Sequence, residues 1–130
     1  MGDIREVLVV DDLPEMVSLI QEHMEEEGYH VRVALTGAEA LRIVENDFVG
    51  VIILDLQLPD MTGLEVFKSM IEMAPLNPVI ILSAFASFEQ VAEAVRLGAY
   101  DFISKTDKVF DLLGDTVGRA SSTLNLSPEL

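Results

Sequence analysis

Five polar side chains stand where short apolar runs of the sequence end. Asp11 and Asp12 follow "EVLVV", Asp55 follows "VIIL", Ser83 follows a second "VIIL", and Lys105 follows "DFIS". Carboxylates gathered in a partly dry cleft repel one another, and proton uptake, a cationic side chain or a hard divalent metal relieves that repulsion. Oxygen ligands in an open cleft favour Mg²⁺, which keeps several waters. If these residues converge, they predict a magnesium site.

The other polar groups indicate what such a metal would neutralise. Lys105 supplies a cation and the Ser83 hydroxyl can donate a hydrogen bond, so the site could hold an anion, and a phosphoryl group fits this combination. The chain has no cysteine, and neither His23 nor His30 follows a predicted strand. The nucleophile for phosphoryl transfer would therefore be a carboxylate, and Asp55 is the central candidate.

These positions depend on strands and helices that alternate along the chain. Five β-branched or aliphatic runs predict strands, with helical periodicity between and after them. The predicted strands are Glu6–Val10, Val31–Ala34, Val51–Leu54, Val79–Leu82 and Asp101–Ser104. The alternation is typical of a single doubly wound, flavodoxin-like α/β domain with a five-stranded parallel sheet and five helices. Its common strand order, 2-1-3-4-5, would place Asp55 next to Asp11 and Asp12.

The helices have their own sequence signals. Capping-box pairs mark three helix starts, at Thr36/Glu39, Thr62/Glu65 and Ser87/Gln90. Three apolar stripes predict buried faces on the first, fourth and fifth helices. The stripes are Leu13, Val17, Ile20 and Met24; Phe88, Val91, Ala92 and Val95; and Val109, Leu112, Leu113 and Val117.

The composition restricts the classes of function. Eight basic residues against 23 acidic ones give a net charge of −15, which disfavours direct nucleic-acid binding by this domain. No apolar run reaches the roughly 18 residues of a membrane span, and the lack of cysteine fits a reducing compartment, so we expect a cytoplasmic protein. We expect one domain over residues 1–121, with 122–130 as a tail or linker stub.

Four motifs in sequence resemble the receiver domains of two-component response regulators. They are "LVVDD", "ILDLQLPDMTGLE", "VIILSA" and "GAYDFISK", and the likeness runs from about Val7 to the fifth helix. The resemblance implies a switch that accepts a phosphoryl group from a sensor histidine kinase and then acts on an output domain or partner. It also implies possible homodimers through the fourth and fifth helices. Such a protein is not a conventional enzyme, although it catalyses its own phosphorylation and slow dephosphorylation.

The resemblance assigns roles at the metal and phosphoryl sites. It implies that Asp55 is the phosphoacceptor. Asp12 would bind Mg²⁺ directly, Asp11 would bind it through water or a neighbouring group, and the backbone carbonyl of Gln57 would be a further ligand.

The resemblance also assigns a switch. Ser83 and Lys105 would contact the phosphoryl oxygens. Phe102 matches an aromatic position that turns inward in the family on activation, when the hydroxyl residue moves toward the phosphate. For Phe102, ordinary packing within a strand is the competing interpretation.

The residue after Lys105 departs from the family pattern, and the rate of dephosphorylation stays open. The family usually has proline after its lysine, with a cis peptide, whereas Lys105 is followed here by Thr106. Because a cis bond before a non-proline residue costs about 2.5–4 kcal/mol, we expect a trans bond. Gln57 and Phe85 occupy positions that tune attack by water on the phosphoryl group, and the size of Phe85 predicts slow dephosphorylation.

Alternative functions differ at identifiable residues. Aspartate-nucleophile phosphatases also use a carboxylate, a hydroxyl, a lysine and Mg²⁺, but they have a second acid where this chain has Gln57. A flavin domain of this fold has a first turn rich in glycine and hydroxyl residues that binds the phosphate of the cofactor, whereas the first turn here is "DDLPEM". A degenerate receiver that serves only protein contacts stays open because of Thr106.

Overall fold

The computed structural model describes residues 5–124 except 48, 74, 75 and 107. Five strands and five helices alternate in this part of the chain, as the sequence predicts. Their bounds are β1 Glu6–Val10, α1 Pro14–Glu26, β2 His30–Ala34, α2 Gly37–Asn46, β3 Val51–Asp55, α3 Gly63–Met73, β4 Val79–Ser83, α4 Phe88–Leu97, β5 Asp101–Ser104 and α5 Val109–Leu124.

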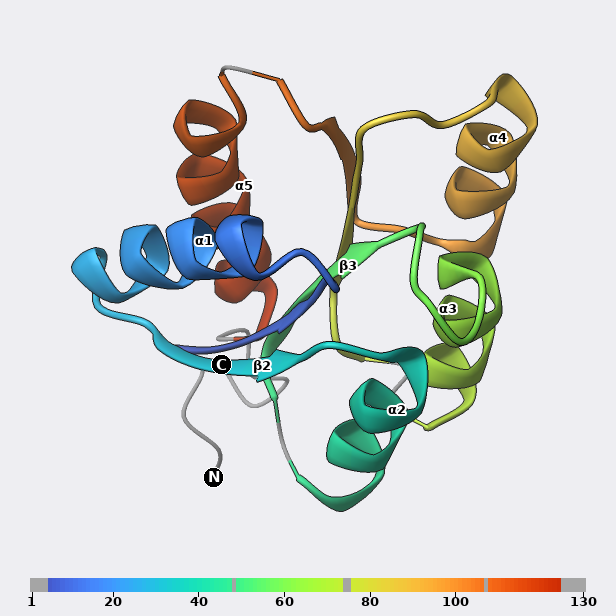
Figure 1. Ribbon diagram of the computed structural model, residues 1–130. Helices are drawn as coiled ribbons and strands as arrows, with labels where there is room; N and C mark the ends of the chain where they lie inside the picture. The colour runs from blue at the N-terminus through green and yellow to red at the C-terminus, as the bar shows by residue number, and fades with distance from the viewer. Residues whose placement is uncertain (1–4, 48, 74–75, 107, 125–130) are drawn as a thin grey trace.

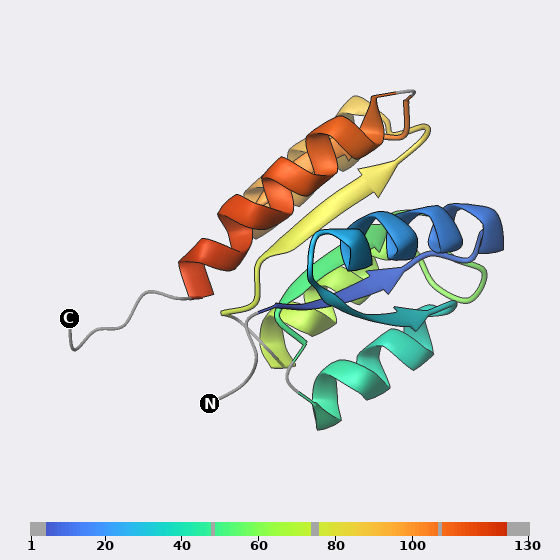
Figure 2. The ribbon, with the colours of Figure 1, turned by 90° about the vertical axis from the view of Figure 1, so that its left-hand side faces the viewer.

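The strands form one parallel sheet in the order β2-β1-β3-β4-β5, which confirms the predicted topology. Helices α1 and α5 cover one face, and α2, α3 and α4 cover the other (Figure 1). The view turned by 90° shows the strands running in one direction between these layers (Figure 2). All residues of β3 and β4 are buried, as expected for strands covered on both faces.

Two hydrophobic cores lie on opposite faces of the sheet. Alternate strand residues divide between them because successive side chains point to opposite faces. In β3, Ile52 and Leu54 pack toward α2, α3 and α4, while Val51 and Ile53 pack toward α1 and α5. The strand that ends in Asp55 is therefore fixed from both sides.

Each of the three predicted apolar stripes contains at least one residue that is exposed. In α4 the buried residue is Ala94, whereas Phe88 and Val95 are 83 % and 64 % exposed. In α5, Val109, Leu113 and Val117 are buried as predicted, but Leu112 is exposed. The α4 prediction is wrong for Phe88 and Val95, whereas Val91 and Ala92 are partly buried. Periodicity shows that one face is apolar without showing which way it points.

The first helix follows its prediction in the interior and departs from it at the start. Val17, Ile20 and Met24 are buried, while Leu13 precedes Pro14 and is 51 % exposed. At the other end of the chain, α5 continues to Leu124, beyond the expected boundary at residue 121. Residues 125–130 of the predicted tail lie outside the described residues, so the domain division stays a prediction.

The strand register staggers the residues that follow each strand. Val10 pairs with Leu54, so Asp11 and Asp55 stand level at the carboxyl ends of β1 and β3. Asp55 pairs with Leu82, and Ser83 pairs with Ser104, which puts Ser83 and then Lys105 one step further out. Among the described residues, no helix is long and apolar enough to span a membrane.

Candidate functional site

Three carboxylates meet at the carboxyl end of the sheet. One oxygen from each of Asp11, Asp12 and Asp55 lies within 4.8 Å of the other two. Asp11 and Asp55 are buried, while Asp12 is partly exposed. The structure thus brings together the three acids that the strand order predicts to be neighbours.

Lys105 reaches this cluster from the end of β5. Its Nζ lies 2.8 Å from Asp11 Oδ2 and 3.0 Å from Asp55 Oδ2, and its side chain is 7 % exposed. Its backbone N–H donates to the carbonyl of Ser83 at 3.0 Å, which fixes the start of the β5–α5 loop. Three carboxylates face one ammonium group, so the cluster keeps an excess of negative charge.

Burial and neighbouring groups shift the pKa values of Asp55 and Lys105. Burial raises the pKa of Asp55, against hydrogen bonds from the Gln57 N–H and Lys105 that favour the charged form, and Asp11 adds to the rise. Burial lowers the pKa of Lys105, but hydrogen bonds and attraction to Asp11 and Asp55 outweigh it and leave the pKa above its ordinary value. Lys105 is therefore an ammonium ion at neutral pH.

Backbone N–H groups orient the buried carboxylates. The N–H of Leu13 donates to Asp11 Oδ1 at 2.9 Å, and the N–H of Gln57 donates to Asp55 Oδ1 at 3.1 Å. Each carboxylate therefore binds the backbone through Oδ1 and Lys105 through Oδ2. The Asp55 side chain is held in one orientation before any ligand arrives.

The β3–α3 loop closes tightly behind Asp55. The N–H of Gly63 donates to the carbonyl of Leu56 at 2.8 Å, and Gln57 and Thr62 form an antiparallel bridge. A Cβ on Gly63 would lie 2.4 Å from Leu56 Cα and 2.5 Å from the Asp55 carbonyl oxygen. The loop can approach the strand end this closely because residue 63 has no side chain.

Gly63→Ala is therefore expected to destabilise the domain. The added methyl group would meet backbone atoms, which cannot rotate away, so we expect a loss of about 1–3 kcal/mol in the free energy of unfolding. Urea denaturation of both proteins measures this loss. Gly98→Ala is not a suitable control because Gly98 has a φ of +97°; Gly118→Ala is suitable, because its Cβ would have no neighbour closer than 3.9 Å.

Ser83 has a buried hydroxyl without a partner. The residue is 1 % exposed, and its Oγ makes no hydrogen bond in the described structure. An unpaired buried hydroxyl is costly, and beside Asp55 a ligand atom could complete its bonding. Ser121 in α5 also has a buried hydroxyl without a partner among the described residues, so the position of Ser83 at the sheet edge is what makes it relevant to the site. Ser83 stands beside Asp55 along the same sheet edge, one strand away.

The remaining predicted site residues lie around this edge. Phe102 is partly buried and packs against the core on the α4 side of the sheet. Phe85 is 81 % exposed, and Gln57 is exposed at the start of the β3–α3 loop. The Lys105–Thr106 peptide bond is trans, as expected, since no cis bond occurs among the described residues.

Asp60 makes contacts that the sequence did not reveal. The sequence places it in a loop beside the site, and the structure shows its carboxylate accepting from the N–H groups of Gly37 and Ala38 at 2.8 and 2.9 Å. These N–H groups, that of Ala38 first, hold the pKa of Asp60 below its usual range. Its partners are 22 and 23 residues away, so no local sequence signal could identify them.

The donor set fits a hard divalent cation. Every candidate ligand is an oxygen, the three carboxylates are close enough to share one ion, and Lys105 leaves part of their charge uncompensated. Mg²⁺ accepts such a set while keeping several waters, and Asp12 lies on the solvent side where waters can remain.

Comparisons with known proteins agree on one family. The family description "Response regulator receiver domain" matches residues 7–114. The transcriptional regulatory protein GlrR of Escherichia coli K12 is 31 % identical over 118 residues, which are 88 % of this chain and 27 % of that protein. The chain therefore spans about a quarter of the length of this relative.

Two solved structures show the same architecture. The response regulator TrrA of Thermotoga maritima, in complex with Mg(2+)-BeF, has a TM-score of 0.79 and 29 % identity over 88 % of this chain and 96 % of that chain. A Burkholderia pseudomallei response regulator with a phosphorylated aspartic acid, calcium ion and citrate has a TM-score of 0.78 and 27 % identity over 92 % and 70 % of the two chains. Together with the family match over most of its length, these likenesses show that the chain belongs to the response regulator receiver domain family.

Proposed function

We propose that the chain is a phosphorylation-controlled switch in which Asp55 accepts a phosphoryl group from a phosphohistidine of a sensor kinase. One observation carries the proposal: a buried Asp55 carboxylate is held by a backbone N–H on one oxygen and by Lys105 on the other, among two further carboxylates. The phosphorylated aspartic acid of the Burkholderia pseudomallei relative supports this role.

Asp55, Lys105 and Ser83 would have separate roles in phosphoryl transfer. A carboxylate oxygen of Asp55 forms the new P–O bond as the P–N bond of the donor breaks, and the departing imidazole keeps the bonding pair and takes a proton from solvent. Lys105, already within reach of Asp55 Oδ2, would neutralise charge on the phosphoryl oxygens. The unpaired Ser83 hydroxyl would donate to another of these oxygens.

The same acids would hold Mg²⁺. Asp12, Asp11 and Asp55, with the backbone carbonyl of Gln57, are the proposed ligands, as the Mg(2+)-BeF complex of the TrrA relative supports. When bound, the ion would supply positive charge beside the incoming phosphoryl group. The protein residues set where that charge lies.

The surface of α4, β5 and α5 would report the modification. Phe88, Val95 and Leu112 expose apolar side chains on these helices, where a binding partner could cover them. A groove of about 530 Å³ between β5 and α5 is lined by Phe102 and Arg119, among others. We propose that an output module, a downstream protein or a second copy of the chain binds this surface. Slow dephosphorylation, tuned by Gln57 and Phe85, stays a prediction.

Phosphorylation with a small phosphodonor tests the proposed function. We expect the unmodified protein to gain one phosphoryl group in the presence of Mg²⁺, and Asp55→Asn to gain none, because an amide cannot form the acyl phosphate. Intact mass spectrometry measures both. Asp47→Asn is a matched control, since Asp47 pairs with Arg32 at the surface, away from the site.

Two results would contradict the proposal. If the unmodified protein gains no phosphoryl group with Mg²⁺ and donor present, the chain is a degenerate receiver that serves only protein contacts. If Asp55→Asn gains the group equally, another residue is the acceptor.

A further inference from the structure

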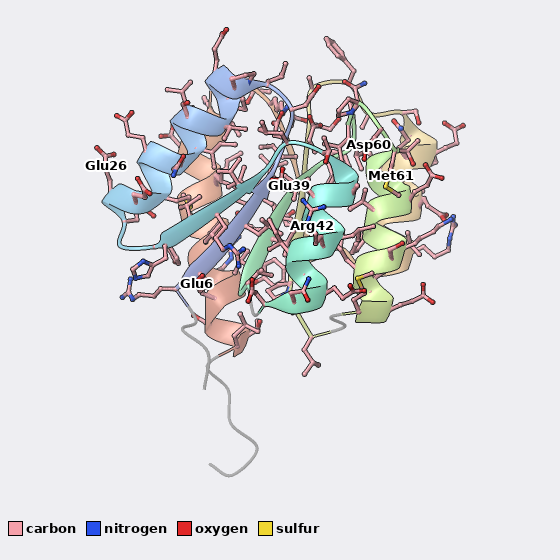
Figure 3. All side chains as sticks on the ribbon, turned by 60° about the horizontal axis from the view of Figure 1, so that its bottom comes forward. Glu6, Glu26, Glu39, Arg42, Asp60 and Met61 are labelled. Carbon is pink, nitrogen blue, oxygen red and sulfur yellow. The ribbon has the colours of Figure 1, made fainter. Side chains whose placement is uncertain are left out.

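Asp60 joins two segments that the phosphoacceptor strand separates. It lies in the loop between β3 and α3, and its carboxylate binds the first turn of α2. Figure 3 shows Asp60 and Met61 beside the end of α2 that also carries Glu39. The contact therefore links the loop that follows Asp55 to a helix that precedes it in the chain.

The first turn of α2 is completed by this contact. A helix begins with N–H groups that have no partner within the helix. Thr36 Oγ1 accepts the N–H of Glu39 at 3.1 Å, and the two carboxylate oxygens of Asp60 accept those of Gly37 and Ala38. A carboxylate at a helix start is also favoured by the helix dipole. The helix start thus gives Asp60 two directed bonds, which fix both the position and the rotation of its carboxylate.

Close packing holds the loop in the same place. A Cβ on Gly37 would lie 2.7 Å from Val66 Cγ2 and 2.9 Å from Met61 Sδ, so the start of α2 touches both the loop and α3. At its base, the loop is closed by the bond from Gly63 to Leu56. The loop is therefore fixed at its base by its own backbone and at its tip by α2.

Gln57 belongs to the base of the loop, where it is bridged to Thr62, and it precedes Asp60 at the tip by three residues. Its N–H orients Asp55, and its carbonyl is the backbone ligand of the proposed Mg²⁺ site. We infer that Asp60 is a positioning residue: by tying the β3–α3 loop to the start of α2, it holds the Gln57 peptide group in the orientation that the metal and Asp55 require. This inference rests on the proposed function, because it gives Asp60 an effect on that same site.

The test separates positioning from ordinary helix capping. Asp60→Ala removes the two hydrogen bonds that join the tip of the loop to the start of α2, whereas Thr36→Ala removes the third bond to the same helix start and leaves the loop tip bound. Calorimetric titration of each metal-free protein with MgCl₂ measures the affinity, and thermal unfolding without metal measures stability. Residues that support metal ligands change affinity by about 10–100-fold when they are removed.

We expect both variants to lose thermal stability but only Asp60→Ala to bind Mg²⁺ more weakly, by about tenfold. Its phosphoryl uptake should be slow at low Mg²⁺ and recover as Mg²⁺ saturates the site. Asp60→Asn keeps one acceptor oxygen, so its affinity should be intermediate; it also serves if Asp60→Ala does not fold.

Three results would overturn the inference. Asp60 is only a helix cap if Asp60→Ala and Asp60→Asn bind Mg²⁺ as tightly as the unmodified protein, or if Thr36→Ala weakens binding equally. In both of these cases the unmodified protein still binds Mg²⁺ and gains a phosphoryl group. If the unmodified protein does neither, the proposed function fails and the role of Asp60 fails with it.

Discussion

Lys105→Met is expected to lower the free energy of unfolding by about 3 kcal/mol at neutral pH without divalent metal. Lys105 is the cation that contacts both Asp11 and Asp55 in the described structure, and all three side chains are nearly buried. Methionine fills similar space but leaves the two carboxylates facing each other without compensation. Urea denaturation measures the loss.

The pH dependence identifies the cause of that loss. Burial and Asp11 already raise the pKa of Asp55, and Lys105 opposes the rise, so its removal raises the pKa further. The folded variant then binds a proton more readily than the unfolded chain, and its stability increases as the pH falls through the folded pKa of Asp55. The difference in the free energy of unfolding between Lys105→Met and the unmodified protein should therefore become smaller as the pH is lowered.

A surface lysine provides the control. Lys68 lies 3.7 Å from Glu93 and its side chain is 57 % exposed, so Lys68→Met should change stability by no more than about 0.5 kcal/mol. If Lys105→Met costs no more than Lys68→Met, or if its cost is the same at every pH, the carboxylates are not the source of the effect.

Mg²⁺ is expected to raise the Tm of the unmodified protein substantially. The ion would bind the folded cluster of Asp11, Asp12 and Asp55 and not the unfolded chain, so at a hundred times its Kd it should add about 2.7 kcal/mol. For a domain of this size, that corresponds to a rise of roughly 10 °C. Thermal unfolding with and without MgCl₂ at constant ionic strength measures it.

Variants of single acids separate this binding from general screening. Asp12→Asn should reduce the Mg²⁺-dependent rise, because it removes one charge from the cluster. Glu26→Gln should leave the rise unchanged, because Glu26 is exposed on α1 and is not one of the clustered acids. An unchanged Tm in saturating Mg²⁺ would show that the three acids do not form a metal site.

The fold followed from the sequence because its signals are local and agree with one another. The apolar runs of β3 and β4 are short, each follows a glycine or proline and each ends at a polar residue, and the Ser87 and Gln90 pair forms the predicted capping box at the start of α4. The meeting of Asp11, Asp12 and Asp55 followed from strand order alone, since parallel strands end at the same edge.

The differences arise where the outcome depends on distant contacts. Phe88 and Val95 lie on an apolar stripe that is exposed, whereas Ala94 is the residue of α4 that is buried in the core. The bond from Asp60 to α2 depends on how the loop packs after folding. Residue type and local spacing cannot predict either result, since both depend on how whole helices and strands are placed relative to one another.

The burial of the central strands determines which part of the sheet can move when the structure around Asp55 changes. β3 ends in Asp55 and is buried between hydrophobic cores on both faces of the sheet. Close-packed interiors of this kind have low compressibility. The neighbouring β4 is equally enclosed, whereas β5 is a short edge strand with only Ile103 fully buried. A structural change at Asp55 is therefore expected to leave the centre of the sheet in place and to move a less buried edge. Of the two edge strands, β5 is the one joined to Asp55, through Lys105 at its end.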